Sequence, residues 1–159
     1  MTGQKSGALL EAAPRPAPPP PVRGSASEAG RGPELSVLII DRDQDLLAIA
    51  TSILESSGYR VTALRQVSDG EKRLRTHVDD VVLLDLDISR AYGSRLLKTG
   101  LLGHGGGRVI LTLTSDIRAE SLLDALGAGA WGHLRKPFSA TGLLELVGRA
   151  GSKRSTPKT

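Results

Sequence analysis

Four polar side chains in this sequence are of the types that handle phosphate groups. Asp41, Asp85 and Thr114 each follow a short apolar run, and Lys136 follows a weaker one. A carboxylate can act as a nucleophile toward phosphorus, and a second carboxylate can help to hold Mg²⁺. A hydroxyl and an ammonium can stabilise phosphoryl oxygens. The set therefore suits phosphoryl transfer, provided that the fold brings the four side chains together.

Apolar patterning predicts the elements that would position these side chains. Three continuous apolar runs are typical of strands buried on both faces, at 37–40, 81–84 and 109–113. Weaker strands are predicted at 60–64 and 130–134. Helical patterns fill the intervals, at 46–54, 67–76, 94–102, 119–126 and 140–150. Strict alternation of strands and helices predicts an α/β fold, with a parallel sheet covered by helices on both faces.

In a parallel sheet, the carboxyl ends of the strands lie on one rim, where open α/β sheets bind their ligands. We therefore expect Asp41, Asp85, Thr114 and Lys136 to converge on that rim. An acid at the end of a buried strand, such as Asp85, is interpreted as a site residue rather than a surface charge.

Two helices have recognisable faces and ends. The first helix is expected to bury the residues that follow helical spacing, namely Leu46, Ile49, Ala50, Ile53 and Leu54. Gly58 is expected to stop it. Ser139 is expected to cap the last helix, with Leu143, Leu146, Val147 and Ala150 on its inner side.

Composition excludes several classes of protein. The 159 residues include no cysteine, so disulfides, thiolate metal sites and cysteine nucleophiles are absent. The sequence has neither an apolar run long enough to cross a membrane nor the pattern of a secretory signal, so we expect a cytoplasmic protein with no membrane contact. Segment 34–150 holds 14 basic and 15 acidic residues, and the net charge of +4 comes from the ends of the chain. Direct DNA binding is therefore not expected.

The chain is predicted to have one folded domain between two tails. Residues 1–33 contain seven of the nine prolines and are rich in glycine and alanine, which is typical of a disordered segment. Residues 34–150 carry the alternating pattern of a folded domain. Residues 151–159 are polar and basic, and we expect a second disordered tail there.

Segment 34–150 resembles the receiver domain of two-component response regulators. The resemblance rests on the motifs at 38–43, 83–87 and 113–115, and on 127–130 followed by Lys136-Pro137-Phe138. The offsets are 44 residues from Asp41 to Asp85, 29 from Asp85 to Thr114 and 22 from Thr114 to Lys136, close to the spacing in that family. The resemblance implies a flavodoxin-like fold with the strand order 2-1-3-4-5.

The resemblance also implies roles for individual residues. Asp85 matches the phosphoacceptor, which takes a phosphoryl group from a sensor histidine kinase or a phosphotransfer protein. Thr114 matches the switch hydroxyl, and Lys136 matches the lysine that contacts the phosphoryl group. His133 occupies the position of the switch aromatic residue. The bond between Lys136 and Pro137 is expected to be cis.

The family implies a Mg²⁺ cofactor, and one of its ligands is replaced here. Asp41, Asp85 and the backbone carbonyl of Asp87 match metal ligands. Arg42 stands where the family usually has a second acid, so it should repel Mg²⁺ and can pair with Asp85. Asp43 is an uncertain substitute for the lost acid. We therefore expect metal-dependent phosphorylation to be weakened or lost.

Three functions stay open from the sequence. One is a single-domain receiver whose output is protein contact through the fourth helix, fifth strand and fifth helix, with homodimers as a further form of association. Another is a haloacid-dehalogenase-like phosphatase with Asp85 as nucleophile and Asp87 as acid and base. Asp116 and Asp124 are not a convincing later metal pair for it. The last is a structural pseudo-receiver that only docks partners. Of these, we expect a signalling module rather than an enzyme.

Overall fold

The computed structural model describes residues 34–87, 90–102, 107–115, 118 and 124–154 of the chain. The chain divides into two units, residues 1–32 and residues 33–159. The prediction of a disordered tail at 1–33 lies outside the described residues, as does the end of the chain after residue 154. The description that follows therefore concerns the second unit.

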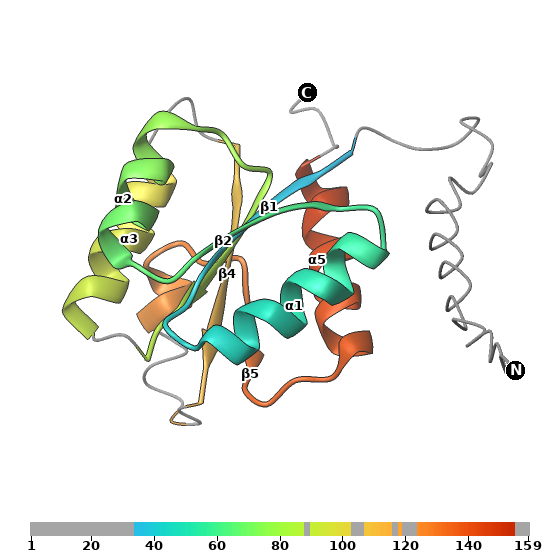
Figure 1. The fold of residues 1–159 in the computed structure, drawn as a ribbon. Helices are drawn as coiled ribbons and strands as arrows, with labels where there is room; N and C mark the ends of the chain where they lie inside the picture. Colours follow the sequence, from blue (N-terminus) through green and yellow to red (C-terminus); the bar gives the residue numbers. More distant parts are fainter. Residues whose placement is uncertain (1–33, 88–89, 103–106, 116–117, 119–123, 155–159) are drawn as a thin grey trace, which may run out of the picture. The chain divides into compact units, whose positions relative to one another are not determined.

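The second unit is built on a five-stranded parallel sheet with the order β2-β1-β3-β4-β5 (Figure 1). The strands are β1 (Ser36–Ile40), β2 (Arg60–Leu64), β3 (Val81–Asp85), β4 (Val109–Thr114) and β5 (Gly132–Arg135). The helices with defined bounds are α1 (Gln44–Ser56), α2 (Val67–Thr76), α3 (Arg90–Leu102) and α5 (Ala140–Arg154). The predicted flavodoxin-like fold and its strand order are thus confirmed.

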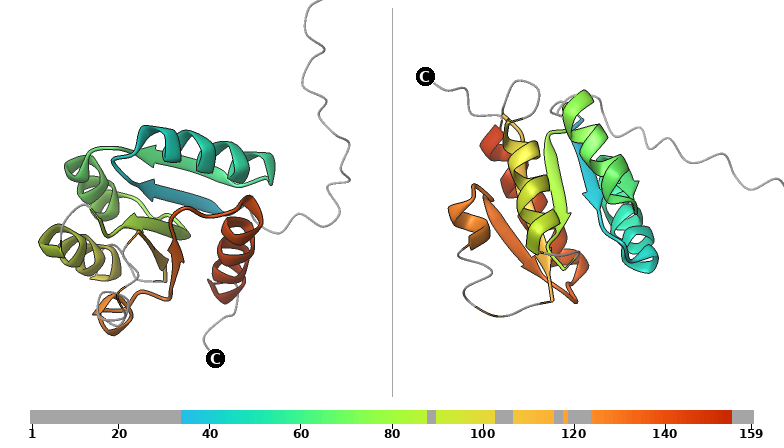
Figure 2. Two further views of the ribbon diagram at one scale, coloured as in Figure 1. Left: turned by 90° about the horizontal axis from the view of Figure 1, so that it is seen from below. Right: turned by 90° about the vertical axis from the view of Figure 1, so that its left-hand side faces the viewer.

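Two apolar layers hold the helices on the sheet. Helices α1 and α5 cover one face, and α2 and α3 cover the other (Figure 2). Alternate residues of β1 face the two layers: Val37 and Ile39 pack under α1 and α5, while Leu38 and Ile40 pack under α2 and α3. The residues that face each layer are buried, which explains why the sequence of β1 is a continuous apolar run.

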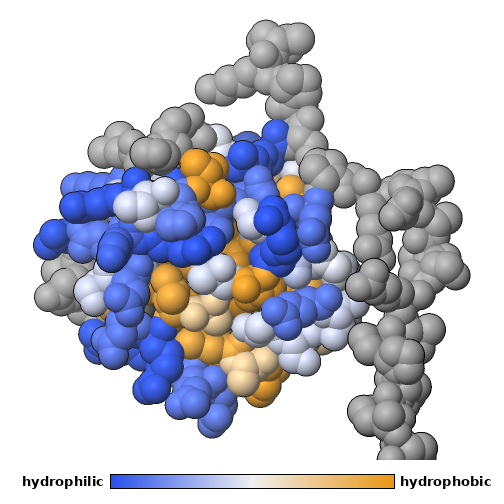
Figure 3. Space-filling model, turned by 45° about the horizontal axis from the view of Figure 1, so that its top comes forward, coloured by the Kyte–Doolittle hydropathy of each residue, from blue (hydrophilic) through white to orange (hydrophobic). Residues whose placement is uncertain are grey.

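The solvent side of the second layer is polar. On the face drawn in Figure 3, hydrophilic residues gather at the left, on the side of α2 and α3. Glu71 of α2 accepts ion pairs there from Arg75 and from Arg95 of α3. None of the helices in the described ranges has the length and apolar character that crossing a membrane requires.

The first helix buries most of the predicted stripe: Ala50 and Leu54 are buried, Leu46 and Ile53 pack partly buried against the core, and Ile49 is the exception. Leu47, Ala50 and Leu54 are its buried residues, whereas Ile49 is 58% exposed. The helix begins at Gln44, and its contact line with the sheet is centred on Ala50, so Ile49 falls on the solvent side. Its predicted end is confirmed, since Gly58 adopts a positive φ of 90° just after the helix.

Several predicted boundaries differ from the structure, and one predicted helix lies mostly outside the described residues. The last strand runs from Gly132 to Arg135 rather than over 130–134. Helix α3 begins at Arg90 rather than residue 94. Helix α5 continues to Arg154, past the predicted boundary at residue 150. The extension is anchored because Arg154 forms an ion pair of 2.8 Å with Asp80. Of the helix predicted at 119–126, only residues 124–126 are described, and these are helical. At the start of α5, Ser139 accepts a hydrogen bond from the backbone N–H of Gly142, as predicted.

Buried polar contacts fix the amino ends of the strands, opposite the rim predicted to carry the site. Asp79 accepts two hydrogen bonds from the Arg73 guanidinium, of 3.0 and 2.9 Å. Asp80 accepts hydrogen bonds from the backbone N–H and hydroxyl of Ser36. Arg108 donates to the carbonyls at the end of α2. These contacts fix the amino end of β3, the strand that ends at Asp85.

Candidate functional site

Four strands deliver the predicted side chains to the same rim. Ile40 pairs with Leu84, so Asp41 and Asp85 follow at equivalent points of neighbouring strands. Thr114 ends β4, and its carbonyl accepts a hydrogen bond from the backbone N–H of Lys136. Asp41, Asp85 and Thr114 are at most 4% exposed. The expected convergence is therefore present, and it joins residues far apart in the sequence.

The ammonium of Lys136 lies among three carboxylates. Its Nζ is 2.7 Å from Asp41 Oδ2, 2.9 Å from Asp85 Oδ1 and 3.6 Å from Asp87 Oδ2. The contact with Asp85 is a hydrogen bond. The contact with Asp41 is an ion pair without hydrogen-bond alignment, because Oδ2 of Asp41 is buried and lacks a hydrogen-bond partner. The single ammonium of Lys136 therefore faces three carboxylates, so this cluster keeps an excess of negative charge.

The protonation of this cluster follows from its burial and its pairing. Burial raises the pKa of Asp85 above its ordinary value of 3.8, and the hydrogen bonds from Lys136 and from the Asp87 backbone only partly oppose this. Burial alone would lower the pKa of Lys136, but its contacts with the carboxylates of Asp41 and Asp85 outweigh burial and raise that pKa. Lys136 therefore stays charged at neutral pH, whereas burial disfavours the ionised form of Asp85.

Asp87 joins the loop after β3 to the end of β4. Its Oδ1 accepts a hydrogen bond of 3.0 Å from the Thr114 hydroxyl. Its Oδ2 accepts bonds of 2.9 and 2.8 Å from the backbone N–H and hydroxyl of Ser115. Burial works to raise the pKa of Asp87, but the bonds from Ser115 and Thr114 together outweigh it and lower that pKa. Asp87 is thus held as an anion.

For the receiver site, the sequence predicted a ligand role only for the backbone of Asp87, and Ser115 was not among the predicted site residues. A signal for the side-chain bridge was present in the residue types. A carboxylate two positions after one strand stood opposite a Thr-Ser pair at the end of the neighbouring strand. Spacing alone did not reveal which way the Asp87 side chain would turn.

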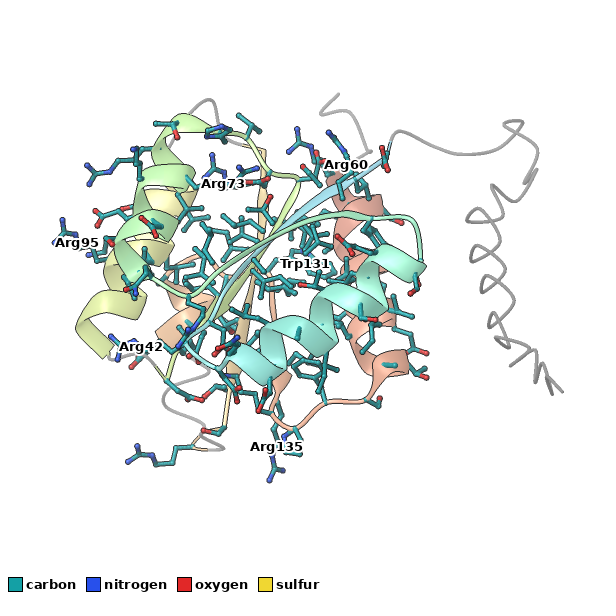
Figure 4. All side chains as sticks on the ribbon, viewed as in Figure 1. Arg42, Arg60, Arg73, Arg95, Trp131 and Arg135 are labelled. Carbon is teal, nitrogen blue, oxygen red and sulfur yellow. The ribbon has the colours of Figure 1, made fainter. Side chains whose placement is uncertain are left out.

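The other predicted residues have different surroundings. Arg42 is exposed (Figure 4), and the ion-pair partner of Asp85 is Lys136, so the predicted pairing of Arg42 with Asp85 was wrong. Asp43 caps α1, because its Oδ1 accepts the backbone N–H groups of Asp45 and Leu46. His133 is exposed on β5. The bond between Lys136 and Pro137 is cis, as expected.

The carboxylates offer a small ligand set for a hard cation. No group of three or more His, Cys, Asp or Glu side chains in the described parts of the chain is arranged to hold a metal ion. Mg²⁺ is, however, commonly bound through one or two carboxylates while it keeps several waters. Asp41 fits that requirement, since its buried Oδ2 has no hydrogen-bond partner, and Asp85 is its neighbour through Lys136. The residues present therefore fit Mg²⁺ bound through one or two carboxylates.

Comparison with known proteins identifies the class. Residues 37–148 match the model of the response regulator receiver domain, and the chain belongs to this family. It is therefore a receiver domain of the two-component response regulators, a signalling phosphoacceptor module rather than an enzyme. The family assignment bears out the expected signalling class and overturns the phosphatase alternative.

Individual relatives agree with this assignment. The chain is 30% identical over 125 residues to protein Rrf1 of Nitratidesulfovibrio vulgaris, a match that covers 77% of this chain and 88% of the relative. It is 31% identical over 115 residues to the swarming motility regulation protein RssB of Serratia marcescens, which covers 72% of this chain. That match spans only 51% of RssB, so some relatives are much longer than the shared domain.

Solved structures share the fold. A CheY-like receiver domain protein from Methanospirillum hungatei JF-1 superposes with a TM-score of 0.71 at 24% identity, covering 77% of this chain and 97% of that one. A two-component response regulator from Clostridium difficile gives a TM-score of 0.71 at 22% identity, covering 77% and 100%. At these identities, the structures establish the common fold.

Replacing Asp85 by asparagine should stabilise the fold at neutral pH. Because the pKa of Asp85 is raised in the folded state, its ionisation there costs free energy, and an uncharged amide removes that cost. We expect Asp85→Asn to raise the free energy of unfolding in urea by about 1 kcal/mol at pH 7. The exposed Asp124→Asn should change it by less than about 0.5 kcal/mol.

The advantage of Asp85→Asn should depend on pH with a definite sign. As pH falls, the folded protein takes up the proton first, and below the ordinary pKa of 3.8 both states are protonated. The stability difference between the two proteins should therefore shrink on acidification and vanish below about pH 4. A difference that grows on acidification would contradict the raised pKa.

Proposed function

We propose that this chain is a phosphorelay receiver in which Asp85 accepts the phosphoryl group. The observation that supports this most directly is the hydrogen bond between Lys136 and Asp85 at the carboxyl rim of the sheet, 2.9 Å long. It pairs a buried carboxylate at a strand end with an ammonium, on the rim where Thr114 ends the neighbouring strand β4. Phosphoryl transfer needs a nucleophile that attacks phosphorus and a positive charge that stabilises the phosphoryl oxygens, and this pair supplies both.

The chemistry follows from these groups. A carboxylate oxygen of Asp85 attacks the phosphorus of a phosphohistidine in the donor protein. The P–N bond breaks, its electron pair stays with the imidazole, and an aspartyl phosphate forms. Lys136 and Thr114 stabilise the phosphoryl oxygens as charge moves onto them. Mg²⁺, when bound by Asp41 and Asp85 with the Asp87 carbonyl, would neutralise further negative charge.

We further propose that metal-dependent phosphorylation is weakened in this receiver. Arg42 places a positive charge one residue from Asp41, where the family usually has an acid, and Asp43 is engaged as the cap of α1. Lys136 already contacts both Asp41 and Asp85, so a cation must compete with the ammonium for them. The same features favour the alternative of a pseudo-receiver that docks partners without phosphorylation.

The proposed partners follow from the class. The phosphodonor is a sensor histidine kinase or a phosphotransfer protein, in the cytoplasm, and the output is a protein contact of a single-domain regulator. The proposed contact face comprises the helix around residues 124–127, β5 and α5. Leu126 is 42% exposed there, and His133 of the edge strand β5 is exposed as well. Arg135 of the same strand is also exposed (Figure 4). A homodimer through this face is part of the proposal.

Phosphorylation can be measured directly. We expect acetyl phosphate with excess Mg²⁺ to add one phosphoryl group to the protein, located at Asp85 by mass spectrometry. Labelling should be at least tenfold slower in Lys136→Ala, because one stabilising charge on the phosphoryl oxygens is lost. Asp85→Asn should abolish labelling, and Asp69→Asn, an exposed acid of α2, should leave it unchanged. Absence of any adduct on the wild-type protein would favour the pseudo-receiver.

Replacing Arg42 should reveal its effect on the cation. We expect Arg42→Asp to bind Mg²⁺ roughly tenfold more tightly, since it exchanges repulsion for attraction beside Asp41. Binding can be followed by calorimetric titration of the unphosphorylated protein. Arg149→Asp makes the same change of charge on the exposed side of α5 and should leave the affinity unaltered. Equal affinities in all three proteins would refute the placement of the ion beside Arg42.

A further inference from the structure

The side chain of Asp87 is surrounded by hydrogen-bond donors. The Thr114 hydroxyl, the Ser115 backbone N–H and the Ser115 hydroxyl each donate to it, at 2.8 to 3.0 Å. The Lys136 ammonium lies 3.6 Å from the same carboxylate. The Asp87 side chain is nevertheless 30% exposed, so burial did not force these contacts. The donors are therefore arranged around an anion.

These donors have the character of a phosphoryl-binding set. A hydroxyl, a main-chain N–H and an ammonium are the groups that bind phosphoryl oxygens in transfer sites. Two of them, Thr114 and Lys136, are the residues to which the proposed function gives that task. Asp87 engages both, and it adds the backbone N–H of Ser115. A phosphoryl group on Asp85 would need the same donors.

We propose that Asp87 is a built-in competitor for the phosphoryl-binding donors of this site. Its carboxylate supplies, within the chain, the anion that Thr114, Ser115 and Lys136 are placed to bind. The inference rests on the proposed function, because that function identifies Asp85 as the residue whose phosphoryl group would compete. It adds a second brake on phosphorylation, independent of Arg42 and of the metal.

The competition has two physical consequences. An arriving phosphoryl group must displace Asp87 from bonds to an ionised acceptor, which are stronger than neutral hydrogen bonds. Meanwhile, the end of β4 is already held by an anion in the unphosphorylated protein, through Thr114 and Ser115. The switch region is thus in an anion-bound arrangement before phosphorylation. Loss of the Asp87 carboxylate should free these donors for an external anion.

The test uses inorganic phosphate as the probe, in the full chain with Asp85→Asn as the background. That background removes the acceptor charge and prevents covalent labelling. We would follow the backbone N–H signal of Ser115 by nitrogen–proton NMR during a phosphate titration without metal. We expect Asp85→Asn/Asp87→Ala to bind phosphate at least tenfold more tightly than Asp85→Asn alone. The Ser115 signal should move already in the absence of phosphate, since its acceptor has gone.

Matched variants separate competition from other effects. Asp69→Ala in the same background removes one exposed negative charge from α2 and should leave phosphate affinity unchanged. Asp87→Asn keeps the size of the side chain and should increase phosphate affinity by a smaller factor. If Asp87→Ala does not fold, the phosphate affinity of Asp87→Asn provides the test. An Asp87 that merely tethered the loop would give variants with unchanged phosphate affinity, and that result would overturn the proposal. Failure of the proposed function would show separately, as a wild-type protein that acetyl phosphate never labels.

Discussion

The site depends on a single ammonium held among carboxylates at the carboxyl rim of the sheet. Lys136 contacts Asp41 and Asp85 directly and lies near Asp87. Without this cation, neighbouring buried carboxylates at the ends of β1 and β3 would repel one another in a poorly solvated place. The fold delivers the lysine through β5 and a hydrogen bond from its backbone N–H to the Thr114 carbonyl. Sheet order and charge balance are therefore linked.

Asp87 complements this cation on the other side of the rim. Lys136 offsets the negative charge of Asp41 and Asp85. The Asp87 carboxylate accepts hydrogen bonds from Thr114 and Ser115, the donors that a phosphoryl group on Asp85 would need. In the unphosphorylated site, the donors at the end of β4 already have an acceptor in the Asp87 carboxylate. Arg42 adds a positive charge at the edge of the same region. Together these residues are the basis for the proposal that phosphorylation of this receiver is restrained.

The sequence was sufficient for the fold and for the convergence of the main residues. Continuous apolar runs identified β1, β3 and β4 because these strands are buried on both faces, and the rim rule then placed Asp41, Asp85 and Thr114. It failed where side-chain direction decided the outcome. The exposure of Ile49, the outward position of Arg42 and the turn of Asp87 toward Ser115 depend on tertiary packing, which periodicity does not encode. The extension of α5 to Arg154 depended on a distant partner, Asp80.

The central claim is that Lys136 keeps Asp85 ionised in spite of its burial. The most direct measurement is a pH titration of the Asp85 carboxyl carbon by NMR, in the wild-type protein and in Lys136→Met. The account predicts that the wild-type pKa lies above the ordinary 3.8 and that loss of the ammonium raises it further. A wild-type pKa at or below 3.8, or a value that does not respond to Lys136→Met, would contradict it.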